Sequence, residues 1–201
     1  MNSEDVFINC PFSDDYDSYF KAILFTVIRS GFNPRCARED DDGGDVRFEK
    51  ICRIIEDCKY GIHDISKTEL DVTSGLPRFN MPLELGLFLG ARKYGDAEQT
   101  LKKTIIFDRD PHRYQQFMSD ISGQDIHAHN NDTLQLIIGV AAWLRRASKR
   151  KTVPGGTAIA SEYAVFMQNL PIMLAARQMQ PEDLTYDDDI TFIAEWLVKN
   201  A

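Results

Sequence analysis

The stretch Tyr60-Gly61-Ile62-His63-Asp64-Ile65 is a short, mostly apolar run with a charged residue near its end. Two runs of the same kind, at 6–8 and 103–108, stand before and after it in the chain. The segments between these runs carry apolar residues at helical spacing, as at 20–28 and 48–55. Short apolar runs that alternate with helices predict right-handed crossovers and a mostly parallel sheet.

Two weaker segments complete a sheet of five strands. Residues 32–37 are expected to form an edge or partly paired strand, because the proline within them cannot donate a backbone hydrogen bond. Residues 125–129 are expected to form a short fifth strand after a helix over 114–121. A long polar connection, 66–80, leads to a helix that begins near Pro82. That helix is apolar nearly all round, which predicts that it is well buried.

The pattern breaks at Pro154-Gly155-Gly156, so residues 1–150 are expected to form the α/β domain and residues 151–201 a helical C-terminal extension. The extension is expected to hold a helix that ends before Pro171, a short segment after it, and a last helix at 190–197. The apolar faces of these helices must cover either the main domain or a partner subunit. They therefore indicate a homo-oligomer formed through the C-terminal helices.

Composition and charge exclude several classes of protein. Of 201 residues, 43% are hydrophobic and 27% charged, which argues against a chain that is disordered throughout. The net charge of −8 disfavours general binding to nucleic acid, and the basic cluster at 145–151 is expected to interact with the end of a helix. No signal peptide and no apolar run of membrane-spanning length occur, which predicts a cytoplasmic protein without a membrane partner. The four cysteines lack zinc spacing and are expected to be free thiols.

Parallel sheets bind ligands outside the carboxyl ends of their strands, near the point where the strand order reverses. The loops after the first, third and fourth strands are therefore the expected places for a site. We expect the wall of a ligand pocket to be formed by four residues at the end of the first strand and just after it, namely Asn9, Pro11, Phe12 and Tyr16. The alternative for this loop is a simple turn between strand and helix. The chain has neither the glycine fingerprint of dinucleotide-binding folds nor a P-loop.

The segment Arg78-Phe79-Asn80-Met81-Pro82-Leu83-Glu84-Leu85-Gly86 places a carboxylate between leucines in an apolar helix. A buried carboxylate is costly unless it is paired, protonated or facing a wet cleft, so we expect Glu84 to face the pocket as the catalytic residue. The alternative is a first-turn glutamate that interacts with the helix dipole. Arg78, Asn80 and Arg47 are expected to bind the ligand, the two arginines through its phosphates. For Arg78, an ordinary solvated arginine is the alternative.

Asp64 closes the third strand, where catalytic side chains lie in such sheets, and is the second catalytic candidate. The alternative is that it caps the next segment. His63 precedes it and points to the opposite face, where a lone histidine is more often structural. His127 and His129 would share one face of the fifth strand, but no third ligand is evident, so no metal site is expected.

The chain resembles a TIR-like domain. The resemblance rests on a first strand with Phe7-Ile8-Asn9, an acidic turn, a second strand, a glycine-containing loop and the helix-borne Glu84-Leu85. The step Glu84-Leu85-Gly86 also resembles the nucleoside deoxyribosyltransferase superfamily. The resemblance covers residues 5–145 and implies a flavodoxin-like sheet with helices on both faces. It also implies a glutamate that breaks the bond between a ribose and its base, and, from bacterial TIR-like members, a role in defence against phage.

The chain departs from both families close to the glutamate. Met81-Pro82-Leu83 stands where TIR domains usually carry Trp-Cys, and Gly75 is too distant for the Gly-Thr pair of the deoxyribosyltransferases. The fold and the role of Glu84 therefore transfer better than the substrate. A single carboxylate is enough for NAD, because nicotinamide leaves as a neutral molecule. A purine would need protonation, for which Asp64 is the candidate.

Three hypotheses about function follow from these residues. The first is an N-glycosidase that cleaves the base–ribose bond of NAD or a related nucleotide, which is then a substrate and not a cofactor. The second is a deoxyribosyltransferase-like enzyme for nucleosides or nucleoside monophosphates, which predicts base exchange and indifference to NAD. The third is a non-catalytic nucleotide sensor or self-assembling adaptor, which predicts stabilisation by the ligand without turnover.

Overall fold

A computed structural model of the chain describes residues 1–39, 42–70 and 75–200. One sheet has the strand order β2-β1-β3-β4-β5, and all neighbouring strands in it are parallel. The strands are β1 (Asn2–Asn9), β2 (Asn33–Arg35), β3 (Cys58–Asp64), β4 (Lys103–Asp108) and β5 (Ile126–Ala128). This is the order of flavodoxin-like folds, so the predicted α/β class and the parallel five-stranded sheet are confirmed.

The burial of the strands explains their sequences. β1 and β3 lie in the middle of the sheet, and Phe7, Ile8 and Ile62 on them are completely buried. Strands that are covered on both faces read as continuous apolar runs, which is why these two were the clearest in the sequence. β2 forms an edge, where Pro34 pairs with Val6 of β1. An edge strand tolerates the missing N–H of proline, so the prediction of an edge strand is confirmed.

The chain divides into two compact units. One comprises Met1–Asp17 with Asn33–Asp132, and the other Ser18–Phe32 with the chain from Thr133 onward. This division differs from the boundary expected near residue 150. The helix α4 (Thr133–Ser148) contacts α5 (Gly156–Ala176), so residues before and after the Pro-Gly-Gly break belong to the same unit.

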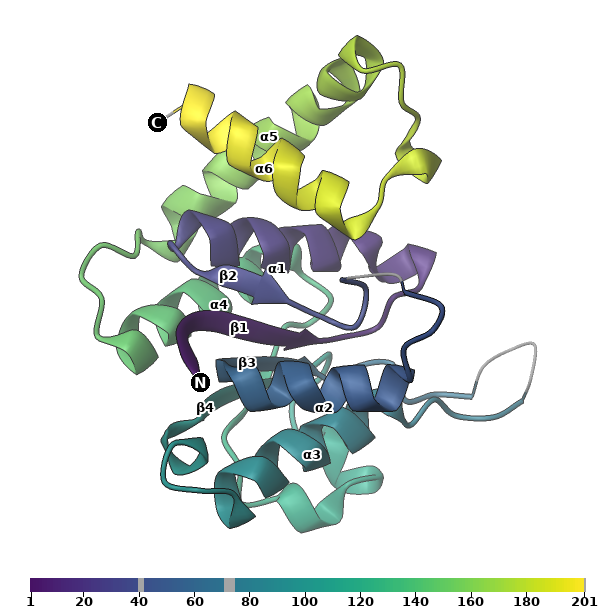
Figure 1. Cartoon of the computed structure of the whole chain (residues 1–201), viewed down its shortest axis with the longest axis vertical. Coiled ribbons are helices and arrows are strands. Elements are labelled where there is room, and N and C mark those ends of the chain that lie inside the picture. The colour runs from purple at the N-terminus through teal and green to yellow at the C-terminus, as the bar shows by residue number, and fades with distance from the viewer. Residues whose placement is uncertain (40–41, 71–74, 201) are drawn as a thin grey trace. The chain divides into compact units, whose positions relative to one another are not determined.

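The first unit contains the sheet, α2 (Arg47–Asp57) and α3 (Asn80–Tyr94). These two helices lie side by side and pack on the central strands (Figure 1). Their shared core contains Phe7, Ala37, Ile51, Ile54, Ile55, Cys58 and Phe88. The helix α3 is less buried than expected, because Leu83 is 54% exposed. The helix rests on the sheet by one face only, and apolar residues on its other face meet solvent.

Short 3-10 turns make up the remaining helical segments of this unit. They are η1 (Asp14–Tyr16), η2 (Gln99–Leu101), η3 (Arg113–Gln116) and η4 (Ser119–Ile121). The single helix expected over 114–121 is instead two short 3-10 turns, η3 and η4. The buried Tyr114 joins a core cluster with Ile65 and Ile106, and the side chains of Phe117, Met118 and Ile121 pack against that cluster. The apolar residues of this segment thus pack on the core cluster from two short turns and not from one regular helix.

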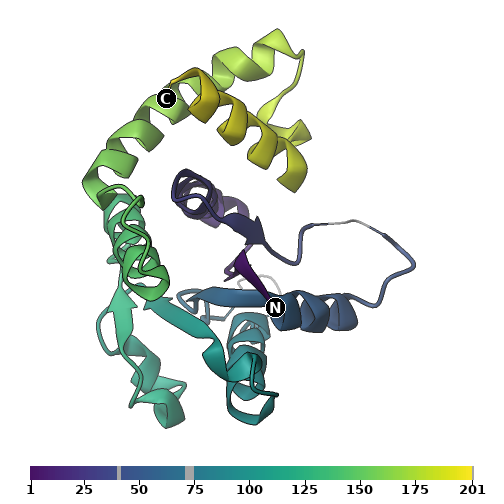
Figure 2. The same ribbon diagram turned by 60° about the vertical axis from the view of Figure 1, so that its left-hand side comes forward.

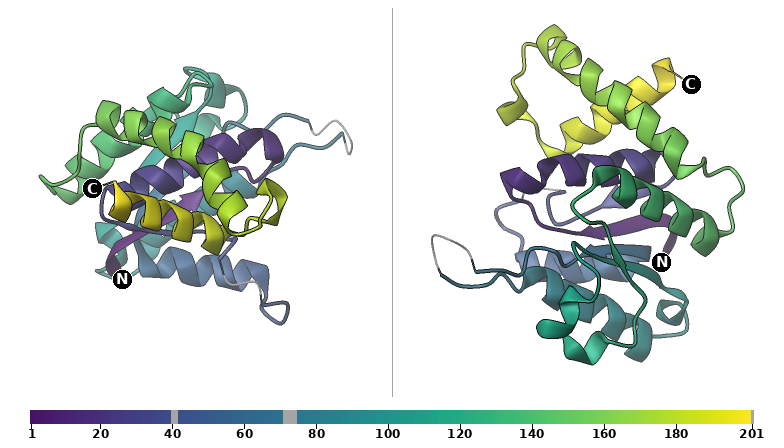
Figure 3. Two further views of the ribbon diagram at one scale, coloured as in Figure 1. Left: turned by 90° about the horizontal axis from the view of Figure 1, so that it is seen from above. Right: turned by 180° about the vertical axis from the view of Figure 1, so that it is seen from behind.

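The second unit is helical and consists of α1 (Asp17–Arg29), α4, α5, η5 (Pro181–Asp183) and α6 (Tyr186–Lys199). Figure 2 shows α5 and α6 side by side, and the rear view in Figure 3 shows α4 leading into α5. Phe25 of α1 lies within 6 Å of the ring centroids of Tyr163, Phe166 and Trp196. The apolar faces of the C-terminal helices therefore cover α1. Whether they also join subunits stays a prediction.

Pro171 does not end a helix, contrary to expectation, because α5 continues through it from Gly156 to Ala176. Proline removes one backbone hydrogen bond from a helix interior, which is destabilising. Here the buried positions Phe166, Leu170 and Leu174 follow one another at four-residue spacing across the proline. Burial of that continuous stripe offsets the lost bond. Within the part of the chain that the structure describes, no helix is long and apolar enough to cross a membrane.

The contact between α3 and β3 depends on a glycine. A Cβ at Gly61 would lie 2.7 Å from Nε2 of His63 and 2.8 Å from the ring of Phe88. Both rings are completely buried, and their centroids are 5.0 Å apart. The missing side chain at Gly61 thus lets Phe88 of α3 pack directly on the sheet.

Replacing Gly61 by alanine should therefore destabilise the protein by about 1–3 kcal/mol, because neither buried ring can move aside. Gly90 in the same helix is the matched control, since a Cβ there meets nothing within 4 Å. Gly90→Ala should stabilise by about 0.5–1 kcal/mol through its better helix propensity. Urea unfolding of the two variants measures both effects. Equal stability of the two variants would contradict the close contact at Gly61.

Candidate functional site

A cleft of about 540 Å³ opens at the carboxyl edge of the sheet. It is built from the segments that follow β1, β3 and β4 and from the first turns of α2 and α3. Its lining residues are Cys10, Pro11, Phe12, Ser13, Asp15, Arg47, Lys67, Glu69, Leu70, Arg78, Asn80, Met81, Glu84 and Arg109. The chain leaves β1 for β2 on one side and returns to β3 on the other, so the strand order reverses between β1 and β3. The cleft lies at the place that the sequence predicted.

The face of α3 that rests on the sheet also carries Glu84. Met81, Leu85 and Phe88 occupy the buried positions of that face, and Glu84 lies one turn before Phe88. In a parallel α/β sheet the helix runs back against the strands, which brings its first turn to their carboxyl edge. Packing of the apolar residues thus places the carboxylate at the cleft, with only 9% of the residue exposed.

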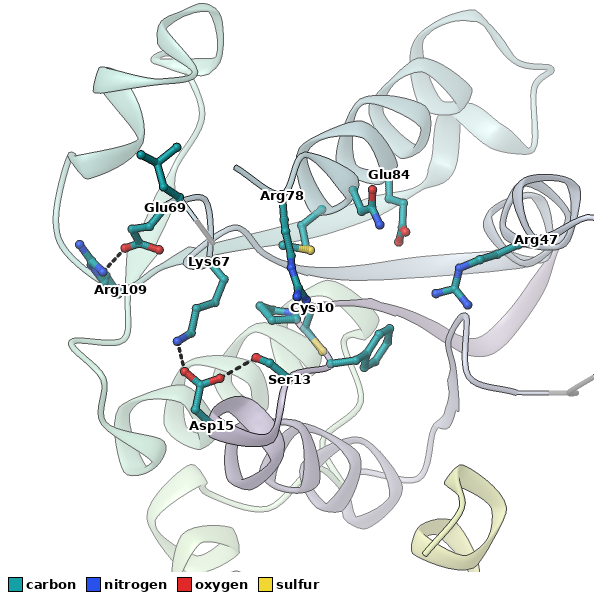
Figure 4. A pocket seen from close by; sticks show the side chains of 14 residues that line it. Cys10, Ser13, Asp15, Arg47, Lys67, Glu69, Arg78, Glu84 and Arg109 are labelled. Carbon is teal, nitrogen blue, oxygen red and sulfur yellow. Dashed lines mark hydrogen bonds and ion pairs between the residues drawn. The ribbon is translucent and has the colours of Figure 1, made fainter. Parts of the chain in front are cut away.

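Burial governs the charge of Glu84. Among residues 1–39, 42–70 and 75–200, no hydrogen bond or ion pair to its carboxylate is found. Desolvation raises the pKa of Glu84 from 4.5 to about 7, and the nearby positive charge of Arg47 opposes this rise. Figure 4 shows Arg47 reaching from α2 toward the carboxylate. A carboxylate held near neutral pKa in a cleft is typical of a reactive group and costs stability when ionised.

Asn9, expected to form a pocket wall, is instead buried beneath the site and does not line the cleft. Its side-chain amide donates to the backbone oxygen of Met81 at 2.8 Å and to Nδ1 of His63 at 3.0 Å. The bond to Met81 fixes the beginning of α3, and the bond to His63 joins Asn9 to the neighbouring strand β3. Asn9 therefore positions the turn that carries Glu84.

His63 is a buried structural residue, as its position in the sequence suggested. Desolvation lowers its pKa to about 3, so the ring is neutral. Because Nδ1 accepts the bond from Asn9, the proton lies on Nε2. The ring makes edge contacts with Phe7 and Phe88, at centroid distances of 5.7 and 5.0 Å. It thus fills the space between β1 and α3.

The second catalytic candidate, Asp64, lies outside the cleft and is completely buried. Its carboxylate accepts hydrogen bonds from the hydroxyl of Tyr16 at 2.5 Å and from the backbone N–H of Ser66 at 2.8 Å. Nε2 of His129 lies 3.3 Å away and carries the proton, since Nδ1 of that ring accepts from Asn131. A buried carboxylate that accepts two hydrogen bonds and has an imidazole nitrogen nearby is a structural anchor. This geometry gives no support to a catalytic Asp64 or to Tyr16 as a pocket wall.

Two ion pairs that the sequence analysis did not identify line the far side of the cleft. Lys67 pairs with Asp15, and Arg109 pairs with Glu69 (Figure 4). Arg78 extends between this side and Glu84 (Figure 4). Lys67 follows β3 and Arg109 follows β4 directly, so charged residues just after a strand end were the available signal.

The thiol in the cleft is not a nucleophile. Cys10 is buried, and desolvation together with the charge of Asp64 raises its pKa well above the usual value. It therefore stays protonated at neutral pH. All four cysteines carry free thiols. Glu84 remains the group in the cleft best suited to stabilise or attack a developing positive charge.

A comparison of the chain with protein-family models, curated proteins and solved structures finds no match.

The raised pKa of Glu84 predicts how stability depends on pH. The folded protein keeps on Glu84 a proton that the unfolded chain loses near pH 4.5. The contribution of Glu84 to the free energy of unfolding is therefore most favourable below pH 4.5, and this advantage is lost as the pH rises to about 7. Glu84→Gln should abolish this loss and be the more stable protein at pH 8, by about 3 kcal/mol. Urea unfolding at pH 5 and pH 8 measures the difference. Glu49→Gln, which changes an exposed residue of α2, is the control. A parent and a Glu84→Gln protein with the same pH dependence would rule out a buried, unpaired carboxylate.

Proposed function

We propose that this chain is an N-glycosidase that hydrolyses the bond between the base and the ribose of NAD or a related nucleotide. The observation that carries the proposal is Glu84, a nine-tenths buried carboxylate that faces a cleft with a pKa of about 7. The resemblance of the sequence to TIR-like domains supports the same reaction. Among the described residues that line the cleft, Glu84 is the only buried carboxylic acid.

The reaction needs a group that tolerates positive charge on the sugar. When the C–N bond breaks, its electron pair stays on the base and the ribose carbon becomes cation-like. The ionised carboxylate of Glu84 either stabilises that carbon or forms a bond to it. A water oxygen then bonds to the carbon and loses a proton, and in the second case it displaces the carboxylate, so that the bond between Glu84 and the sugar breaks. Nicotinamide leaves as a neutral molecule, so the reaction needs no second carboxylate as acid.

Other residues of the cleft suit a nucleotide. Phe12 offers an aromatic surface for a base or sugar, and the guanidinium of Arg38 lies 4.9 Å from its ring centroid and holds it in place. Asn80 lies one turn before Glu84 and offers an amide to hydroxyl groups. A cleft of about 540 Å³ is within the usual range for small-molecule sites.

Product analysis by chromatography tests this proposal. Purified protein should release nicotinamide from NAD, or free base from a related nucleotide, and Glu84→Gln should lower the rate at least 100-fold, as is usual for loss of a key electrostatic group. Glu49→Gln is the control and should keep parental activity. A Glu84→Gln protein as active as the parent would refute the assignment. Base exchange without hydrolysis would point instead to a transferase.

The pH dependence of the reaction tests the role of Glu84 separately. Its carboxylate must be ionised, so kcat/KM should fall below an apparent pKa of about 7. Arg47→Gln removes the positive charge that opposes the rise in the pKa of Glu84. The pH below which kcat/KM falls should therefore be higher in this variant. Lys93→Gln, exposed at the end of α3, is the control and should leave the profile in place. An apparent pKa that is the same in Arg47→Gln and in the parent would show that the fall in kcat/KM comes from a group other than Glu84.

A further inference from the structure

The cations of the cleft divide into two groups. Arg47 lies on the side of Glu84, and Lys67 and Arg109 lie on the opposite side, with Arg78 extending between the two (Figure 4). Glu84 repels anions when it is ionised, so the anionic part of a ligand belongs on the opposite side. That side combines two cations, Lys67 and Arg109, with two carboxylates, within a protein whose net charge is −8. Among the described residues that line the whole cleft, four are cations and three are carboxylates.

The carboxylates that pair with Lys67 and Arg109 each have a second partner. The hydroxyl of Ser13 donates to Asp15 at 2.6 Å, and Arg113 lies 3.6 Å from Glu69. The side chain of Asp15 is 62% exposed, and that of Glu69 is 42% exposed. Exposed ion pairs contribute little to stability, so each carboxylate is able to give up its cation at small cost while it keeps its second partner. In each pair the cation is the less exposed member. The side chain of Lys67 is 41% exposed against 62% for Asp15, and that of Arg109 is 37% exposed against 42% for Glu69. They are therefore the members of each pair that stay at the cleft when a competing anion enters.

Arg109 is held in place by a second carboxylate. Its Nε donates to Asp110 at 2.8 Å, and Asp110 is not part of the cleft lining. The guanidinium thus keeps its position when Glu69 leaves. Lys67 lies three residues after the end of β3, and Arg109 directly follows β4. The two cations therefore come from the segments that follow two adjacent strands.

We propose that Lys67 and Arg109 bind the diphosphate group of the ligand, and that Asp15 and Glu69 are counter-ions that the diphosphate displaces. This inference rests on the proposed function, since it names the part of the nucleotide that this side of the cleft recognises. A diphosphate offers several charged oxygens, enough for both cations at once, whereas an uncharged nucleoside offers none. The ribose is then directed toward Glu84, and Arg78 lies along the path between the two groups (Figure 4).

Titration calorimetry with inorganic pyrophosphate, in the presence of a metal chelator, tests the diphosphate site without any turnover. Lys67→Met and Arg109→Met should each weaken binding about tenfold, as expected for loss of one charge-assisted contact. Asp15→Asn should strengthen binding about threefold, because Lys67 no longer has to exchange partners. Lys93→Met is the control and should bind like the parent. Binding should weaken as salt is added.

Each result supports or overturns one part of the proposal. No binding by the parent, or unchanged binding by both methionine variants, would overturn the diphosphate site. Unchanged or weaker binding by Asp15→Asn would overturn the displacement of counter-ions. Glu84→Gln should keep the affinity of the parent or exceed it, so this measurement is independent of bond cleavage. Failure of the cleavage assay with intact pyrophosphate binding would leave a diphosphate-binding protein and refute only the N-glycosidase.

Discussion

The position of α3 on the sheet is the constraint on which the candidate site depends. Phe88 packs on the backbone of Gly61 and the ring of His63, and Asn9 joins His63 to the backbone of Met81. The first contact sets how closely the helix approaches the sheet, and the second sets where its first turn begins. Glu84 lies between these two contacts on the same face of the helix, so its place at the cleft follows from packing that involves no ligand.

The sequence predicted the features that arise from local periodicity. Alternation of apolar runs and helical segments gave the parallel sheet, and a general rule for such sheets gave the edge where the cleft lies. The predicted residues Phe12, Arg47, Arg78, Asn80 and Glu84 all line it. Phe12 follows β1, Arg47 and Asn80 begin α2 and α3, Arg78 lies just before α3, and Glu84 lies one turn into that helix.

The places of Tyr16, Lys67 and Asp15 depend on contacts between distant segments. Tyr16 was expected at the cleft, but it bonds to Asp64, 48 residues further on. Lys67 and Asp15 are 52 residues apart, so no local pattern shows their pairing. Asn9 is a different case, since the alternation of a strand puts it on the same face as Phe7, against α3. That signal was present in the sequence and predicts the burial of Asn9.

Glu84 and Asp64 show why burial alone does not identify a catalytic carboxylate. Both are buried acids near the carboxyl edge of the sheet. Asp64 is surrounded by the Tyr16 hydroxyl, a backbone N–H and an imidazole, which supply in the folded protein what water supplies in the unfolded chain. For Glu84, the charge of Arg47 is the one interaction found among the described residues that compensates its desolvation. A folded chain that keeps such a carboxylate gives up stability at neutral pH, and it does so beside a cleft large enough for a nucleotide. The difference between the two acids is therefore the strongest physical reason to look for chemistry at Glu84 and for structure at Asp64.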